Sequence, residues 1–205
     1  MTENKVIDLS NAILIGEGDH KRTFVDPTDP GRCIKVLFTY PDVDMERELK
    51  YRRSREKRGL KSQLLPAYYG TVETNLGKGY VFERVADFDG SSSKTFQQVF
   101  GEAAADPGLL PLVEEAMVRF KELLFRELII ISNTQAANFV LQRTSKTRFT
   151  IRIIDNLGSP VFLPLAYYFD SVARKRLTKY WKRFLHELGE KFPTVMTEEL
   201  KNRLL

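Results

Sequence analysis

Apolar positions in the first ninety residues come in short runs that are separated by polar turns. The segments Ala12–Gly16, TFV at 23–25 and Arg32–Phe38 are each short enough to predict a β-strand. The turn signal DPTDPG lies between the second and the third, so the pattern predicts a three-stranded antiparallel meander. Two further runs, QLLPAYYGTVET and YVFERVADFDG, are joined at the glycine pair of NLGKG and predict another hairpin.

Helical spacing of apolar residues is found in three segments. Residues 44–58 predict a highly charged helix with Met45 and Leu49 on one face. Leu109–Leu128 predicts an amphipathic helix with a continuous apolar stripe, and a third helix is expected from about Ser171 to Leu188, followed by a polar tail.

The order of these elements predicts an α+β fold. Strands dominate the N-terminal part and helices the C-terminal part, and DGSSSK at 89–94 is the strongest linker signal in the chain. We therefore expect a single two-lobed domain over 1–205, with a strand-rich lobe at about 1–88 and a reduced helical lobe at about 94–205.

Two oxygen-bearing side chains flank the centre of the second half. The stretch IIISNTQAAN ends at Asn138 and leads into FVLQ, while TIRIIDNLG places Asp155 after a second apolar run. An antiparallel hairpin would bring Asn138 and Asp155 close together. Carboxylate and amide oxygens suit a magnesium ion that is bound together with a nucleotide.

The composition is that of an ordinary globular protein with a basic balance. Hydrophobic residues make up 42% and charged residues 29%, and the net charge of +5 favours anionic partners. The N-terminal MTENKVIDLS has no apolar signal core and no run approaches bilayer length, so we expect a cytoplasmic protein without a transmembrane segment. The single cysteine, Cys33, lies in an apolar run and is interpreted as a buried structural thiol.

A glycine turn and a strand lysine suggest where phosphate could bind. Gly16 and Gly18 lie between two predicted strands, where glycine lets the backbone approach a phosphate, although a tight hairpin needs the same residues. Lys35 interrupts an apolar strand, so its charge needs a carboxylate or a ligand phosphate. Helical periodicity offers Glu46 and Glu48 equally as the carboxylate.

The order of these parts resembles the protein-kinase-like fold: a glycine turn, a strand lysine, a helix glutamate, a loop ending in Asn138 and a strand ending in Asp155. The segments RCIKV, RELKY, GTVET, GYVFERVADFDG and DNLG are similar to those of the YrbL family of PhoP regulatory network proteins. The resemblance favours Glu48 over Glu46. It implies ATP and Mg²⁺ as cofactors, with Gly16, Gly18, Lys35 and Glu48 at the nucleotide and Asn138 and Asp155 at the metal.

One position departs from the kinase pattern. An active kinase carries an aspartate five residues before the metal-binding asparagine, where it orients the substrate hydroxyl. Here that position is Asn133, and an amide cannot accept a proton as a carboxylate does. The sequence therefore favours a regulatory pseudokinase over an active kinase, although a divergent kinase stays open.

The alternative is a non-catalytic interaction module. The basic segment from Arg47 to Lys61 would bind an acidic regulatory protein, membrane headgroups or nucleic acid. Nucleic acid is the least favoured of these partners, because no recognised reading motif accompanies the charge.

Overall fold

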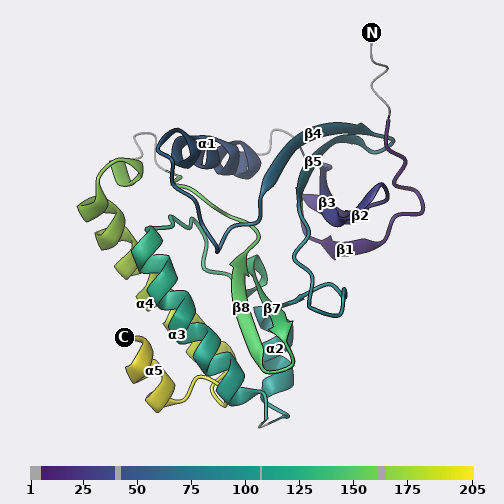
Figure 1. Cartoon of the computed structure of the whole chain (residues 1–205). Coiled ribbons are helices and arrows are strands. Elements are labelled where there is room, and N and C mark those ends of the chain that lie inside the picture. Colours follow the sequence, from purple (N-terminus) through teal and green to yellow (C-terminus); the bar gives the residue numbers. More distant parts are fainter. Residues whose placement is uncertain (1–5, 40–42, 107, 161–164) are drawn as a thin grey trace. The chain divides into compact units, whose positions relative to one another are not determined.

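The computed structural model describes residues 6–39, 43–106, 108–160 and 165–205. The chain divides into two compact units, each built from two separate stretches of sequence. Unit 1 comprises Met1–Val43 and Pro66–Ser92, and unit 2 comprises Asp44–Leu65 and Ser93–Leu205. Figure 1 shows the strands β1 to β5 in unit 1 and the helices in unit 2.

Unit 1 is a five-stranded antiparallel sheet with the order β1-β2-β3-β5-β4. Its strands are β1 (Leu14–Glu17), β2 (Lys21–Asp26), β3 (Asp29–Leu37), β4 (Tyr68–Thr74) and β5 (Gly77–Glu83). The predicted meander and the predicted hairpin at NLGKG are both present. Since β3 pairs with β5, the two stretches of unit 1 form one sheet.

A small apolar core supports this sheet and includes Phe24, Ile34 and Val81. Gly79 lies opposite Val36 in the β3–β5 ladder, and a Cβ there would come within 2.5 Å of Ile34 Cγ2. Cys33 is buried as predicted, and burial raises the pKa of its thiol, so it stays protonated and unreactive.

Unit 2 combines helices with a three-stranded antiparallel sheet of order β6-β7-β8. Its elements are α1 (Val43–Lys57), β6 (Lys94–Thr95), α2 (Phe96–Ala103), α3 (Leu110–Glu127), η1 (Ala136–Asn138), β7 (Phe139–Ser145), β8 (Arg148–Ile153), η2 (Leu165–Tyr167), α4 (Asp170–Lys191) and α5 (Glu198–Leu204). The β7–β8 hairpin lies beside α3 (Figure 1).

Aromatic side chains form a cluster within the core of unit 2. Phe96 is fully buried, and its ring lies 5.5 Å from Phe139 and 5.9 Å from Phe184, so α2, β7 and α4 pack around one centre. Trp181 extends this cluster and donates its indole N–H to the carbonyl of Leu204 at 2.7 Å, which ties α5 to α4.

The predicted α+β class is confirmed, as are the three predicted helices and the central hairpin. The polar tail was predicted wrongly, because residues 198–204 form α5, which begins at the Thr197 cap and buries Leu200 and Leu204. Helix α2 was also not predicted, although Thr95 and Gln98 form a capping box at its start. Among the described residues, no helix combines the length and apolar character needed to cross a bilayer.

Candidate functional site

The β7–β8 hairpin brings Asn138 and Asp155 together at one end of unit 2. Phe139 pairs with Ile153, and beyond this pair the N–H of Ile154 donates to the carbonyl of Asn138 at 2.9 Å. Asp155 is the next residue. The backbone of unit 2 therefore brings residues 138 and 155 close in space, while their joint role at a metal ion stays a prediction.

The segments that flank the hairpin continue the pairing. Ile131 bridges to Leu157, and the N–H groups of Ser132 and Gly158 donate to the carbonyls of Asn156 and Ile130, each at 2.8 Å. The segment that follows Asp155 contains two residues of positive φ, Asn156 at 60° and Gly158 at 91°. The loop after Asp155 is thus held by regular backbone hydrogen bonds.

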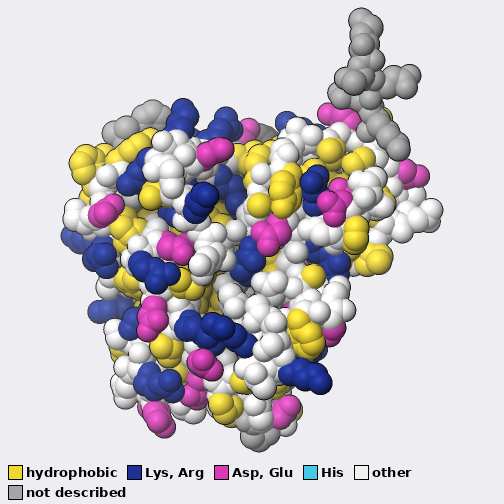
Figure 2. Space-filling view, viewed as in Figure 1, with side chains coloured by type: hydrophobic (Ala, Val, Ile, Leu, Met, Phe, Trp, Pro, Cys, Tyr) yellow, Lys and Arg dark blue, Asp and Glu magenta, His cyan; other side chains and the backbone are white. Residues whose placement is uncertain are grey.

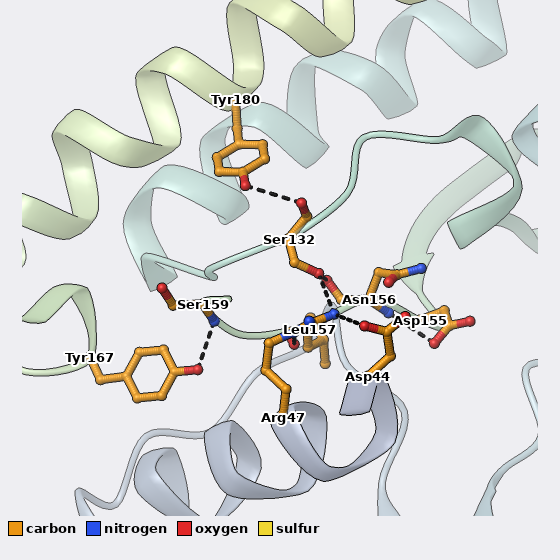
Figure 3. Close-up of polar contacts among 9 residues, drawn as sticks. All are labelled: Asp44, Arg47, Ser132, Asp155, Asn156, Leu157, Ser159, Tyr167 and Tyr180. Carbon is orange, nitrogen blue, oxygen red and sulfur yellow. Dashed lines mark hydrogen bonds and ion pairs between the residues drawn. The ribbon is translucent and has the colours of Figure 1, made fainter. Parts of the chain in front are cut away.

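Arg47 of α1 contacts both of the paired segments, 130–132 and 156–158 (Figure 3). Its guanidinium donates to Ser132 Oγ at 3.0 Å and to the carbonyl of Leu157 at 3.4 Å, and it forms an ion pair with Asp44. Ser132 Oγ in turn donates to the carbonyl of Asn156 at 2.8 Å. One helix residue therefore contacts both strands of the pairing around Asp155.

Two tyrosines hold the outer ends of the same segments (Figure 3). Tyr180 on α4 donates to the carbonyl of Ser132 at 3.0 Å, and Tyr167 accepts from the N–H of Ser159 at 2.7 Å. Burial raises the pKa of the Tyr167 hydroxyl, so it stays protonated. These hydrogen bonds link the segments around Asp155 to α4 and to η2.

Asn133, the position that departs from the kinase pattern, is engaged locally. Its side-chain oxygen accepts from the N–H of Gln135 at 2.9 Å, which forms an Asx turn. The neighbouring Thr134 is buried and donates to Glu187 on α4 at 2.8 Å. The turn needs only an acceptor oxygen at residue 133, which a carboxylate also provides.

Asn138 carries the main unsatisfied polar group of the site. Its side chain is 6% exposed, and its Nδ2 is buried without a hydrogen-bond partner in the part of the chain that the structure describes. A buried donor without an acceptor costs about 1–3 kcal/mol. Such a cost is expected at a position where a ligand completes the hydrogen bonding.

The donor set suits a magnesium ion that arrives with a nucleotide. Within the described residues, no three His, Cys, Asp or Glu side chains are grouped so as to hold a metal. Mg²⁺ commonly takes one or two protein carboxylates and completes its octahedron with waters and phosphate oxygens. Asp155 and the amide oxygen of Asn138 could supply the few protein ligands of such an ion, but they are too few to coordinate a metal without waters or phosphate.

The other predicted residues lie in both units. Gly16 is in β1 and Gly18 in the β1–β2 turn, where the N–H of Gly18 donates to the carbonyl of Lys21 at 3.0 Å. Lys35 is buried in β3, with its ammonium 4.6 Å from the centre of the Phe82 ring. These three residues belong to unit 1.

Glu48 belongs to unit 2. It is buried in α1 and pairs with Arg52 at 2.8 Å, whereas Glu46 is exposed. The burial is consistent with the choice of Glu48 over Glu46, while its pairing with Lys35 stays a prediction.

The basic helix is less solvated than its composition suggested. Arg47 and Arg52 have side chains that are only 14% and 12% exposed, and Arg55 is buried. Arg47 was not predicted as a site residue, because in the sequence it is one of many basic residues in the same segment. The available signal was its spacing four residues before Tyr51, which places both on one helix face.

Comparison with known proteins adds the family. The model of the PhoP regulatory network protein YrbL family matches residues 7–189. The uncharacterized protein YrbL of Escherichia coli (strain K12) is 30% identical over 183 residues, which cover 88% of this chain and 87% of the relative. The protein of the same name from Shigella flexneri matches with the same identity and coverage.

Proposed function

Because the chain belongs to the family of the PhoP regulatory network protein YrbL, we propose that it is a kinase-like protein that binds ATP with Mg²⁺ and regulates PhoP-type two-component signalling. The observation that carries the proposal is the backbone hydrogen bond from Ile154 to Asn138, which sets Asp155 beside Asn138. The resemblance to the protein-kinase-like order of parts is our ground for assigning Gly16, Gly18 and Lys35 to the nucleotide phosphates.

Each residue has a defined part in the proposed binding. Asp155 would supply a carboxylate and Asn138 an amide oxygen to the ion, while the Nδ2 of Asn138 is a buried donor without a partner in the described part of the chain. A magnesium ion held there would offset part of the phosphate charge. By resemblance to protein kinases, Lys35 would pair with the α- and β-phosphates, and Glu48 is assigned as the carboxylate partner of the strand lysine.

Asn133 supports a regulatory function over phosphate transfer. The amide cannot take a proton from a substrate hydroxyl, and its oxygen already serves the turn to Gln135. Removal of a general base costs about 100-fold to 10,000-fold in rate. The protein would therefore respond to nucleotide through its conformation or partners, with turnover absent or very slow.

A thermal-shift titration tests the binding. Mg²⁺–ATP should raise the Tm, because a ligand that binds only the folded state stabilises it; at a concentration of 100 Kd the gain is about 2.7 kcal/mol. Lys35→Met should lose most of the shift. A flat response to millimolar ATP, with and without magnesium, would contradict the proposal.

Asp155→Asn tests the metal. The amide retains the shape and the acceptor for the N–H of Asn156, at 2.9 Å in the wild type, but removes the charge that the ion needs. We expect native circular dichroism with the magnesium dependence of ATP binding lost. Asp106→Asn is the matched control, because that carboxylate likewise accepts a nearby backbone N–H, from Gly108 at 2.9 Å. Unchanged magnesium dependence in Asp155→Asn would remove Asp155 from the metal site.

A further inference from the structure

A cavity with a volume of about 310 Å³ lies within unit 2, and neither Asn138 nor Asp155 lines it. The end of α1 with the turn after it, the end of α3 and the segment around η2 form its walls. Its volume is at the lower end of the range for small-molecule sites, about 300–1000 Å³. The charged side chains that line it are Arg55, Arg58, Lys61, Arg126, Glu127 and Asp170.

The local sequence explains why the basic residues meet there. Helix α1 ends in a Schellman motif: Leu60 N–H donates to the carbonyl of Arg55 at 3.0 Å, and Gly59 N–H donates to that of Glu56 at 2.9 Å. Gly59 takes a φ of 68°, which glycine adopts at no steric cost. The turn reverses the chain, so that the carbonyl of Lys61 accepts from Arg55 at 3.3 Å.

Arg55 is the buried centre of the cavity wall. It is 6% exposed, and its Nη1 donates to the carbonyl of Glu127 at 3.0 Å and to Tyr51 Oη at 3.4 Å. Its Nε is buried without a partner, and no carboxylate in the described part of the chain forms an ion pair with it. Carbonyls orient a guanidinium but do not supply a compensating full charge.

The charges around Arg55 do not cancel. Four basic side chains face two acidic ones, and the carboxylate of Glu127 accepts from Ser62. Asp170 is 74% exposed and lies 3.9 Å from Arg58, which makes a weak surface pair. The C-terminal ends of α1 and α3 each contribute about half a negative charge, which still leaves the cavity positive by about one unit. Figure 2 shows acidic side chains interspersed with basic ones on the face in view.

We propose that this cavity binds the phosphate group of a small anion. A phosphate would offset the charges of Arg58, Lys61 and Arg126 through charge-assisted hydrogen bonds, and it would partly compensate the buried charge of Arg55. Tyr51 and Tyr167, whose rings lie 4.8 Å apart, add an aromatic wall that suits the organic part of a phosphate monoester. The site is independent of the nucleotide proposal, since neither Asn138 nor Asp155 lines it.

Calorimetric titration of the full chain tests this site, with inorganic phosphate and phenyl phosphate as probes at constant ionic strength. The wild type should bind, and the variants Arg58→Gln and Arg126→Gln should each bind about tenfold more weakly. Tighter binding of phenyl phosphate assigns the cavity to organic phosphates, and equal binding assigns it to free phosphate. Either result supports a phosphate site.

Matched controls separate this cavity from general charge attraction. Arg53→Gln and Lys57→Gln remove exposed cations of α1 that do not line the cavity, so both should bind like the wild type. Asp155→Asn should also keep phosphate binding, while Arg126→Gln should keep the ATP response. No binding by the wild type at millimolar probe, or equal losses in Arg53→Gln and Arg126→Gln, would overturn the proposal.

Discussion

Gly158 should be the least replaceable residue of the loop after Asp155. Its φ of 91° is strained for any residue with a Cβ. A Cβ built there would lie 2.7 Å from Tyr167 Oη and 3.1 Å from both Arg47 Cγ and Tyr51 Cβ. Gly158→Ala therefore combines a backbone penalty with a packing penalty.

The magnitude follows from the two terms. The left-handed conformation costs about 1–2 kcal/mol for a non-glycine residue, and an extra methyl group in a packed site costs about 1–3 kcal/mol. A loss of about 3 kcal/mol should lower the Tm by about 6–12 °C for a chain of this length. The Tyr167–Ser159 hydrogen bond must shift as well, because the new methyl group occupies the space next to the hydroxyl.

Thermal unfolding of three variants separates these terms. Gly59 has a φ of 68° but no atom within 4 Å of its Cβ position, so Gly59→Ala should show the backbone term alone. Gly101 lies in α2 with open space and no positive φ, so Gly101→Ala should be neutral or stabilising by about 0.5–1 kcal/mol. If Gly158→Ala and Gly59→Ala lower the Tm by the same amount, then the close contacts to Tyr167 and Arg47 add no packing penalty at residue 158. A wild-type Tm for Gly158→Ala would refute the described conformation of the loop.

Two further predictions concern residues 133 and 187. Asn133→Asp should fold normally, because the carboxylate can still accept the hydrogen bond from the N–H of Gln135. If only the general base is missing, this variant should gain ATP hydrolysis or phosphate transfer. Wild-type rates of about 1 per second or more, which are ordinary for kinases, would refute the pseudokinase assignment. Partial burial alone would raise the pKa of Glu187, but hydrogen bonds from Arg183 and Thr134 and the charge of Arg183 outweigh it, so the pKa lies below its usual value of 4.5. The stabilisation is therefore present above pH 4.5 and lost as pH falls through the lower folded-state pKa, so the Tm difference between wild type and Glu187→Gln should shrink from pH 6 to pH 3. The exposed Glu190 is the control. A Tm difference for Glu187→Gln that stays constant from pH 6 to pH 3, or an equally pH-dependent difference for Glu190→Gln, would contradict the lowered pKa of Glu187.

The strands and long helices could be predicted because their apolar residues repeat with a clear period. Helix α1 shows the limit of this reasoning. Its buried residues are Met45, Glu48, Tyr51 and Arg55, so half of the buried positions are charged and a hydrophobic pattern cannot identify them. Their burial depends on partners distant in sequence, such as the carbonyl of Glu127, 72 residues from Arg55.

In the candidate site, too, the features set by local geometry could be predicted and those set by contacts between distant elements could not. The proximity of Asn138 and Asp155 was predictable, since hairpin geometry is local and fixed by the register. The clamp by Arg47 and the hydroxyls of Tyr167 and Tyr180 was not, because each comes from a separate element and contacts backbone carbonyls or N–H groups that no pattern specifies. The anion cavity was hidden for the same reason: its basic residues are contributed by two helix ends.

The division of the chain determines how the protein can be cut. The backbone passes between the two units three times, after residues 43, 65 and 92. A protease that cleaves in the DGSSSK linker would therefore leave Tyr51 and Leu64, which belong to the core of unit 2, on the N-terminal fragment. The N-terminal fragment keeps the whole core of unit 1, whereas the core of unit 2 is divided between the two fragments. We therefore expect the two pieces to stay associated after cleavage, and the C-terminal fragment not to fold when it is expressed alone. Expression of unit 2 as a separate domain would require a gene that starts at residue 44 and lacks the codons for 66–92, so that 44–65 is joined to 93–205.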